Sequence, residues 1–209
     1  MRLYFVRHAE TLGNVGGEYD QSSSGTLTPR GQKQARDLVK RLEKFEFSDI
    51  IVSPLERVVL TIMPFLKNKG RKAEAWPELA EMRGKRVQPD ELPSEIRNGP
   101  AMELPKAAAN FVQRRPDLDA LLLPPPEESY SEGQRRVKLA CDLIRNRYAG
   151  ENVSILVVGH ACNGARVIEC LMGLDLDGRF QHDNAGITCI EQKLTGDFIM
   201  RFQNLAPRS

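Results

Sequence analysis

Two arginines and two histidines follow short apolar segments of the sequence. They are Arg7 and His8 after the first segment, Arg57 shortly after the second, and His160 after the third. The apolar segments are residues 3–6, 50–52 and 155–158, and none of them alternates with polar residues. Such runs are typical of strands buried on both faces of a sheet. Because ligands of open α/β sheets bind beyond the carboxyl ends of the strands, we expect the four side chains to meet at one edge.

This combination of residue types favours the chemistry of a phosphate group. The guanidinium groups of Arg7 and Arg57 can clamp a phosphate through planar, bidentate hydrogen bonds. Arg57 also lies near a predicted helix N-terminus, where a cation is expected if a bound anion separates it from the helix end. A solvent-facing arginine is the alternative. Metal binding by the two histidines is another alternative, but no carboxylate or cysteine accompanies them at a suitable spacing.

Capping residues predict the helices that position these side chains. Thr28 can cap a helix that begins at Pro29, and apolar residues then recur at helical spacing. Ser53, followed by Pro54 and Glu56, has the pattern of a capping box for a second helix. Pro64 is expected to kink or shorten this helix and Gly70 to close it. Two more helices are predicted, at about residues 130–148 and directly after His160.

Strands alternate with these helices along the chain. Besides the three apolar segments, strands are predicted at residues 73–76, 188–190 and 198–200. The last two are separated by Thr195-Gly196-Asp197, which indicates a hairpin. Alternating strands and helices predict an α/β fold, namely a three-layer αβα sandwich with a mainly parallel sheet and an antiparallel edge strand.

The segment from residue 85 to residue 128 has a different composition. It contains eight of the 13 prolines of the chain, and one helix is expected within it, at about residues 103–114. We interpret the chain as one domain over residues 1–209, with 85–128 as a cap insertion that folds over the sheet edge. A disordered linker is the alternative, but Phe111, Val112 and the apolar residues 121–123 are typical of a core.

The composition limits the classes of partner and the compartment. A chain of 209 residues with a net charge of +2 does not have the charge of a general nucleic-acid or membrane-surface binder. No stretch is long and apolar enough for a membrane span or a signal-peptide core. The four cysteines lack CxxC spacing, which favours free thiols and a cytoplasmic location.

Several segments of the chain, in order, resemble the histidine phosphatase superfamily, which includes the phosphoglycerate mutases and related phosphatases. The resemblance spans most of the chain. It rests on Phe5-Val6-Arg7-His8-Ala9-Glu10-Thr11 with Asn14, Leu27-Thr28-Pro29-Arg30-Gly31 with Gln34-Ala35, Ser53-Pro54-Leu55-Glu56-Arg57 with Thr61, Leu79-Ala80-Glu81, Glu128-Ser129 with Arg136-Val137, and Val158-Gly159-His160.

The resemblance implies a role for each residue of the predicted site. His8 would attack phosphorus and form a phosphohistidine. Glu81 would protonate the leaving oxygen and then activate water. The phosphoryl oxygens would be surrounded by Arg7, Arg57, His160 and Asn14, and the substrate-binding set also includes Ala161 and Arg83. No metal or organic cofactor is needed for this chemistry.

Some positions leave alternatives open. Glu78 lies one turn from Glu81 and is the other candidate for the acid, although the Leu-x-Glu spacing favours Glu81. Ala161-Cys162-Asn163 stands where glycines are usual in the family. Cys162 is therefore either a buried, inert thiol or a thiol made more acidic by a helix N-terminus close to the phosphate. His182 is interpreted as structural or as part of the rim of the site.

The function that the resemblance favours is hydrolysis of a phosphomonoester of a small metabolite. The main alternative is a phosphoglycerate mutase, but Ser24-Gly25-Thr26 and Glu81-Met82-Arg83-Gly84 replace the motifs that mutases tend to carry. A non-catalytic phosphate-binding protein and a phosphoprotein phosphatase are further alternatives. We expect a small phosphorylated substrate as the partner, with no nucleic acid and no membrane; a homo-oligomer is compatible with the sequence.

Overall fold

The protein is described by a computed structural model that covers residues 1–16, 26–82 and 95–206. Its centre is a seven-stranded sheet in the order β5-β3-β2-β7-β1-β8-β9. The strands are β1 (Arg2–Arg7), β2 (Asp49–Val52), β3 (Ala73–Ala75), β5 (Val112–Arg114), β7 (Ser154–Gly159), β8 (Ile187–Gln192) and β9 (Phe198–Leu205). Five strands run parallel to one another: β1, β2, β3, β5 and β7. β8 pairs antiparallel with β1, and β9 pairs antiparallel with β8 at the edge of the sheet.

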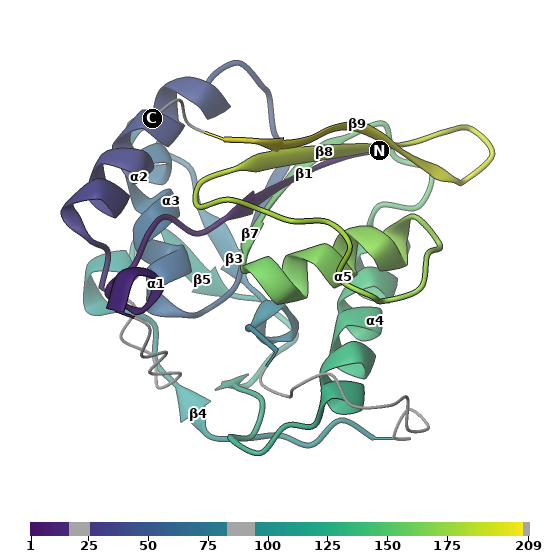
Figure 1. Cartoon of the computed structure of the whole chain (residues 1–209), viewed down its shortest axis with the longest axis horizontal. Helices are drawn as coiled ribbons and strands as arrows, with labels where there is room; N and C mark the ends of the chain where they lie inside the picture. The colour runs from purple at the N-terminus through teal and green to yellow at the C-terminus, as the bar shows by residue number, and fades with distance from the viewer. Residues whose placement is uncertain (17–25, 83–94, 207–209) are drawn as a thin grey trace.

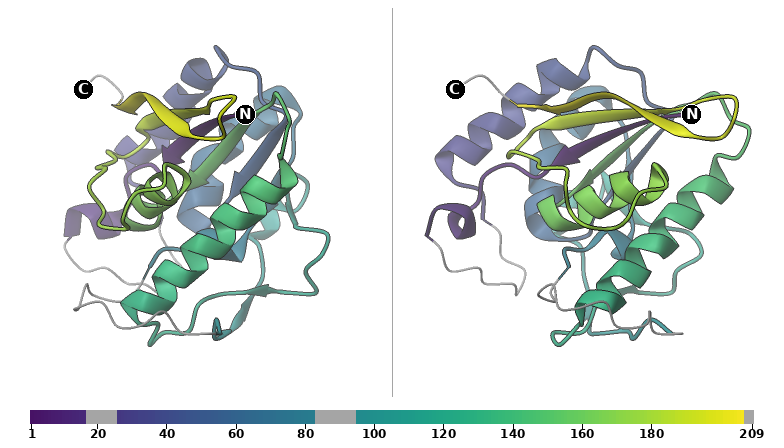
Figure 2. Two further views of the ribbon diagram at one scale, coloured as in Figure 1. Left: turned by 90° about the vertical axis from the view of Figure 1, so that its right-hand side faces the viewer. Right: turned by 45° about the vertical axis from the view of Figure 1, so that its right-hand side comes forward.

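Helices cover both faces of this sheet, as Figures 1 and 2 show. One layer contains α2 (Pro29–Leu42) and α3 (Glu56–Lys69), and the other contains α4 (Tyr130–Arg147) and α5 (Ala161–Leu171). Successive side chains of a strand point to opposite faces, so each layer has its own core. The predicted three-layer αβα sandwich with a mainly parallel sheet and an antiparallel edge strand is confirmed.

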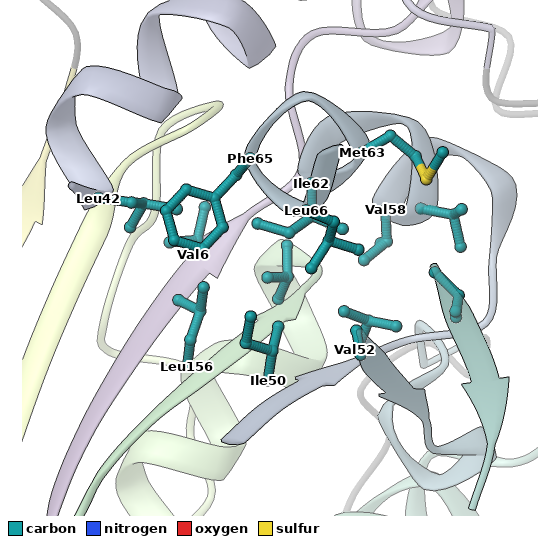
Figure 3. Close-up of a cluster of buried hydrophobic side chains, with 14 of the residues drawn as sticks. Val6, Leu42, Ile50, Val52, Val58, Ile62, Met63, Phe65, Leu66 and Leu156 are labelled. Carbon is teal, nitrogen blue, oxygen red and sulfur yellow. The ribbon is translucent and has the colours of Figure 1, made fainter. Parts of the chain in front are cut away.

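The alternation is clear in β1. Tyr4 and Val6 pack in the core under α2 and α3, and Leu3 and Phe5 pack in the core under α4 and α5. Figure 3 shows the first of these cores, in which Val6 lies among side chains of β2, β7 and α3. Because both faces of β1 are fully buried, its position is set on both sides, and so is the position of the residues that follow it.

The helix after Leu27 begins as the sequence predicts. The Thr28 side chain accepts a hydrogen bond from the Gly31 amide at 2.9 Å, and Pro29 is the first residue of α2. In α3 the predicted cap is wrong, because the helix begins at Glu56 with Leu55 as its N-cap and no side-chain cap. Pro64 does not shorten α3, which continues to Lys69 and ends at Gly70 in a left-handed conformation with φ of 60°.

The proline-rich segment has no α-helix over residues 103–114, so that prediction is wrong. Its described part contains β4 (Ala101–Met102), the 3-10 helix η2 (Lys106–Ala108), β5 and β6 (Leu121–Leu122). β5 pairs with β3 and so belongs to the main sheet, whereas β4 and β6 form a separate two-stranded ladder. The single-domain organisation with residues 85–128 as a cap stays a prediction.

Two short elements complete the description: α1 (Leu12–Gly16), directly after the first strand, and the 3-10 helix η1 (Pro77–Leu79), directly after β3. The helix expected at about 130–148 is α4, and the one expected after His160 is α5. Among the described residues, no helix has the length and apolar character needed to cross a membrane.

Candidate functional site

Three strand ends meet at one edge of the sheet. β7 lies between β1 and β2, with Arg7 opposite Gly159 and Val52 opposite Val158. The His8 amide donates to the Gly159 carbonyl at 2.9 Å, and the Ser53 amide donates to the Val158 carbonyl at 2.9 Å. The residues that follow the three strands are therefore neighbours. The rings of His8 and His160 lie 5.4 Å apart, centroid to centroid, with an angle of 62° between their planes.

His8 is fully buried and its ring orientation is fixed. Nδ1 lies 2.8 Å from the Ala9 carbonyl oxygen and must donate to it, because that oxygen can only accept. Nε2 is then the unprotonated nitrogen of the neutral ring. It is buried and has no hydrogen-bond partner within the described part of the chain. Burial, together with the Arg57 and Arg7 cations, lowers the pKa of His8 to about 3, so the ring is neutral near pH 7.

His160 is held in a similar way by a hydroxyl group. Its Nε2 lies 2.8 Å from the Ser53 Oγ, and its Nδ1 is buried without a partner among the residues described. Burial and then the charge of Arg57 lower its pKa well below the ordinary value. Two neutral imidazole rings therefore each present a buried nitrogen that the described protein does not bond. Buried polar atoms without a partner call for an explanation, and a ligand bound between these two rings would supply one.

Positive charge lies around the two rings. Arg57 is 5% exposed and lies near a helix N-terminus as the sequence predicts, although it is the second residue of α3 and not one turn into the helix. Arg7 donates from Nη1 to the His182 carbonyl at 2.8 Å. Both arginines contribute to the lowered pKa values of His8 and His160, so all four side chains lie within one electrostatic field. Two guanidinium groups and neutral donors at one point suit a phosphate dianion.

Hydrogen bonds from other elements fix the loop after His8. The Ala9 amide donates to the Thr61 Oγ1 of α3 at 2.9 Å. Asn14 accepts the Thr11 amide at 3.0 Å, which closes the turn into α1. Asn184 was not singled out from the sequence. Its side-chain amide donates both to the His8 carbonyl at 3.0 Å and to the Asn14 Oδ1 at 3.2 Å.

Glu81 lies at the N-terminus of α5, beside His160 and Ala161. Its Oε1 accepts the Asn163 amide at 2.8 Å and its Oε2 accepts the Cys162 amide at 3.3 Å. Because His160 is the N-cap of this helix, the carboxylate and the imidazole share one helix end. A carboxylate is electrostatically favoured there.

Glu78 has a different environment. Its carboxylate forms a bidentate ion pair with Arg115, with N–O distances of 3.0 and 3.2 Å, and both side chains are mostly buried. The Arg115 guanidinium also lies 4.8 Å from the Trp76 ring centroid. This ion pair gives the Glu78 carboxylate a structural partner, whereas the Glu81 carboxylate is bonded to backbone amides at the N-terminus of α5. The geometry therefore favours Glu81 over Glu78 as the acid.

Three further predictions concern the rim of the site. Cys162 is exposed, so the interpretation of this residue as a buried thiol is wrong. Its pKa is raised by desolvation and by the Glu81 carboxylate, so it is not an activated thiol either. His182 is buried, with Nδ1 3.1 Å from the Thr188 Oγ1, which fits its structural interpretation. Arg83 lies outside the described residues.

Within the described part of the chain, no group of three or more His, Cys, Asp or Glu side chains could hold a metal ion.

Comparison with known proteins places the chain in a family. Residues 3–204 match the model of the histidine phosphatase superfamily, branch 1, and the chain belongs to this superfamily. The chain is 37% identical to the adenosylcobalamin/alpha-ribazole phosphatase of Escherichia coli over 82 residues, which is 39% of this chain and 40% of that protein. The phosphatases of the same name from Salmonella typhi and Salmonella typhimurium match over a similar length. The chain therefore spans only about two fifths of the length of these three curated relatives.

Other matches extend along almost the whole chain. Phosphoserine phosphatase 1 of Hydrogenobacter thermophilus is 26% identical, with 96% of this chain and 91% of that protein covered. The crystal structure of the alpha-ribazole phosphatase from Shigella flexneri superimposes with a TM-score of 0.71 at 26% identity, covering 98% of this chain and 96% of that one. These relatives are phosphatases that act on small metabolites, so the resemblance stated from the sequence is confirmed.

Proposed function

We propose that this chain is a phosphomonoesterase for a small phosphorylated metabolite and that it acts through a phosphohistidine on His8. The observation that carries the proposal is the His8 ring. It is neutral, its Nδ1 proton is donated to the Ala9 carbonyl, and its Nε2 is buried without a partner in the described protein, in the field of Arg57 and Arg7. This is the protonation state and tautomer that a nitrogen nucleophile needs.

The reaction takes place in two steps. In the first step His8 Nε2 attacks phosphorus, the phosphorus–oxygen bond to the leaving group breaks, and the Glu81 carboxyl group gives its proton to the leaving oxygen. In the second step the Glu81 carboxylate takes a proton from water, the water oxygen attacks phosphorus, and the bond to His8 breaks. Splitting one difficult displacement into two lowers each barrier, and general acid–base catalysis contributes about 10²- to 10⁴-fold.

The other residues stabilise the transferred group. Arg7 and Arg57 neutralise the equatorial oxygens, and His160 supplies a hydrogen bond through Nδ1. Each such preorganised contact is worth about 3 kcal/mol in the transition state. The Ser53 hydroxyl holds His160 Nε2, which leaves Nδ1 for the phosphoryl oxygens. We place Asn14 and the Ala161 amide at the edge of the same pocket; a contact of Arg83 with substrate stays a prediction.

Three candidate substrates are suggested by the relatives and by the mutase alternative. They are an alpha-ribazole phosphate, phosphoserine and a phosphoglycerate. The absence of mutase-type motifs from the sequence favours hydrolysis, because a mutase must keep water away from the phosphohistidine.

A screen of phosphorylated metabolites, with His8→Ala as the blank, tests the proposal. We expect phosphate release from at least one small phosphate ester, with kcat lowered by about 10⁴-fold or more in the variant. An acid-labile phosphoryl label should be trapped on the wild-type protein and not on the variant. Interconversion of 2- and 3-phosphoglycerate without phosphate release would instead favour the mutase. Equal phosphate release by both proteins would contradict the proposal.

A further inference from the structure

The backbone that carries Glu81 is held by a buried arginine of a different element. Arg136 of α4 is 3% exposed and its guanidinium faces the carbonyl groups of residues 78–81. Nη1 donates to the Glu78 carbonyl at 2.9 Å and to the Ala80 carbonyl at 2.6 Å, and Nη2 donates to the Glu81 carbonyl at 3.3 Å. One side chain therefore binds three carbonyl groups of the segment that follows β3.

Glu128 fixes the orientation of this guanidinium. Its two carboxylate oxygens accept from Arg136 Nε at 2.7 Å and from Nη2 at 2.8 Å, in a bidentate pair. Glu128 is 4% exposed, so the pair is almost completely removed from water. Removing one partner of such a pair leaves an uncompensated buried charge, whereas the intact pair keeps the planar fork in one geometry.

Residues 78–81 have little regular secondary structure that could fix the position of Glu81. η1 ends at Leu79, and the Ala80 amide closes its last turn on the Pro77 carbonyl. Beyond that turn, the Glu81 backbone is bonded to α4 through Arg136, and its carboxylate is bonded to the first turn of α5. The acid is therefore fixed at both ends by two different helices.

We propose that Arg136, oriented by Glu128, is a positioning residue that places the Glu81 carboxyl group against the leaving oxygen. This inference rests on the proposed function of Glu81. A rival role for Arg136 is electrostatic, because its charge also contributes to the lowered pKa of His160. The two roles differ in one measurable respect. A general field effect slows all substrates alike, whereas a misplaced acid slows only substrates whose leaving group needs a proton.

Arg136→Lys separates these roles, because lysine keeps the positive charge and loses the planar fork. We would measure kcat/KM for p-nitrophenyl phosphate, whose leaving group needs little protonation, and for an alkyl phosphate, whose leaving group needs it fully. We expect a loss of about 10- to 100-fold for the alkyl ester and less than about threefold for the nitrophenyl ester. Glu128→Gln, which weakens the hold on the guanidinium, should show the same pattern with a smaller loss.

A double-mutant cycle then connects Arg136 to the acid. In the Glu81→Gln background, Arg136→Lys should cause no further loss with the alkyl ester, because the proton donor is already absent. The matched control is Arg145→Lys, another α4 arginine that donates to a backbone carbonyl, that of Cys170, away from Glu81. It should leave both rates within about twofold of wild type, in the range of an independent site.

Four outcomes would overturn the inference. Equal losses with the two esters would show a field effect or a general disturbance, and additive losses in the cycle would show that Arg136 does not act through Glu81. Loss of the native circular dichroism spectrum in both Arg136→Lys and Glu128→Gln would show that the pair serves the fold as a whole. If Glu81→Gln itself has no dependence on the leaving group, the acid assignment fails and the inference fails with it.

Discussion

At the scale of single residues, the site depends on imidazole rings that stay neutral. Burial and the neighbouring cations lower the pKa of His8 to about 3, whereas an ordinary histidine has a pKa near 6.5. A neutral ring between pH 4 and 8 means that the nucleophile does not depend on deprotonation in the physiological range. Any acid limb of the rate profile above about pH 4 must then come from other groups or from the substrate.

An NMR titration measures this directly. We expect the ring carbon shifts of His8, His160 and His182 to stay constant between pH 8 and pH 5, because all three pKa values are lowered. The same protein in concentrated urea is the control and should titrate near pH 6.5. A folded-state midpoint above pH 6 for His8 would contradict the environment described here.

The two candidate carboxylates make a second test at this scale. Glu78→Gln should lower the free energy of unfolding by about 2 kcal/mol, because the mostly buried Arg115 loses its bidentate partner and keeps only its ion pair with Asp117. It should leave unchanged the ratio of kcat/KM for the alkyl ester to kcat/KM for the nitrophenyl ester, a ratio that reports the first step alone. Glu81→Gln should lower that ratio by about 10²-fold or more. The opposite assignment of the two effects would make Glu78 the acid.

The residue types that carry the chemistry could be predicted, but several of their supporting contacts could not. Ser53 precedes Pro54 and was interpreted as a helix cap. Its hydroxyl lies 2.8 Å from His160 Nε2 instead, and α3 begins three residues after it, at Glu56. Asn184 has the neighbours of an ordinary turn, so its bond to the His8 carbonyl depends on tertiary contacts that no local pattern specifies.

At the scale of elements, the local helix preference led to a wrong prediction at β5, an edge strand that pairs with β3. Residues 103–114 have apolar spacing compatible with a helix, yet Val112 lies in β5, where it pairs with Ala73 of β3 and enters the core under α3. Pro105 is instead the N-cap of the short 3-10 helix η2. The gain from extending a parallel sheet is a long-range contact and leaves no periodic pattern in the sequence.

The contact between α5 and the sheet gives a test at this scale. Gly164 lies so close to Phe5 of β1 that a Cβ atom would be 2.0 Å from the ring. Gly164→Ala should therefore destabilise the protein by about 1–3 kcal/mol, the usual cost of overpacking. Urea unfolding would measure the change in stability. The substitution should lower turnover as well, because α5 begins at the site.

A double-mutant cycle that combines Gly164→Ala with Phe5→Leu tests whether the alanine contacts the Phe5 ring. Because Phe5→Leu removes ring atoms from the contact, the double variant should be more stable than the sum of the two single changes predicts. Gly150→Ala is a matched control for spatial crowding, since a Cβ there would meet nothing within 4 Å, although its φ of +74° adds strain of its own. A purely additive cycle would show that the Phe5 ring is not what the alanine contacts.

At the scale of the whole molecule, the chain has three histidines and all of them have lowered pKa values. In the unfolded chain the histidine side chains become protonated near pH 6.5, whereas in the folded protein they become protonated only at much lower pH. Unfolding is therefore coupled to proton uptake between these limits. The stability that the neutral histidines contribute is complete above about pH 7 and is lost as the pH falls toward 4 and below.

Urea unfolding at several pH values measures this coupling. Between pH 6 and pH 4.5 the free energy of unfolding should fall by up to about 4 kcal/mol per pH unit, since each histidine contributes about 1.4. His182→Asn should reduce the slope by about one third, because the pKa of His182 is about 4 and its folded ring stays neutral over this range. An unchanged slope in that variant would contradict the coupling.

The position of β1 between β7 and β8 has a consequence for how the protein is made. β1 is synthesised before β7 and β8 and cannot pair with either strand until residues 154–192 have been made. During translation β1 exposes two apolar faces and two unpaired edges, which is a state that chaperones bind and in which chains aggregate. The phosphate pocket is then one of the last parts to form, so a nascent chain that stalls before β7 carries the nucleophile and no site.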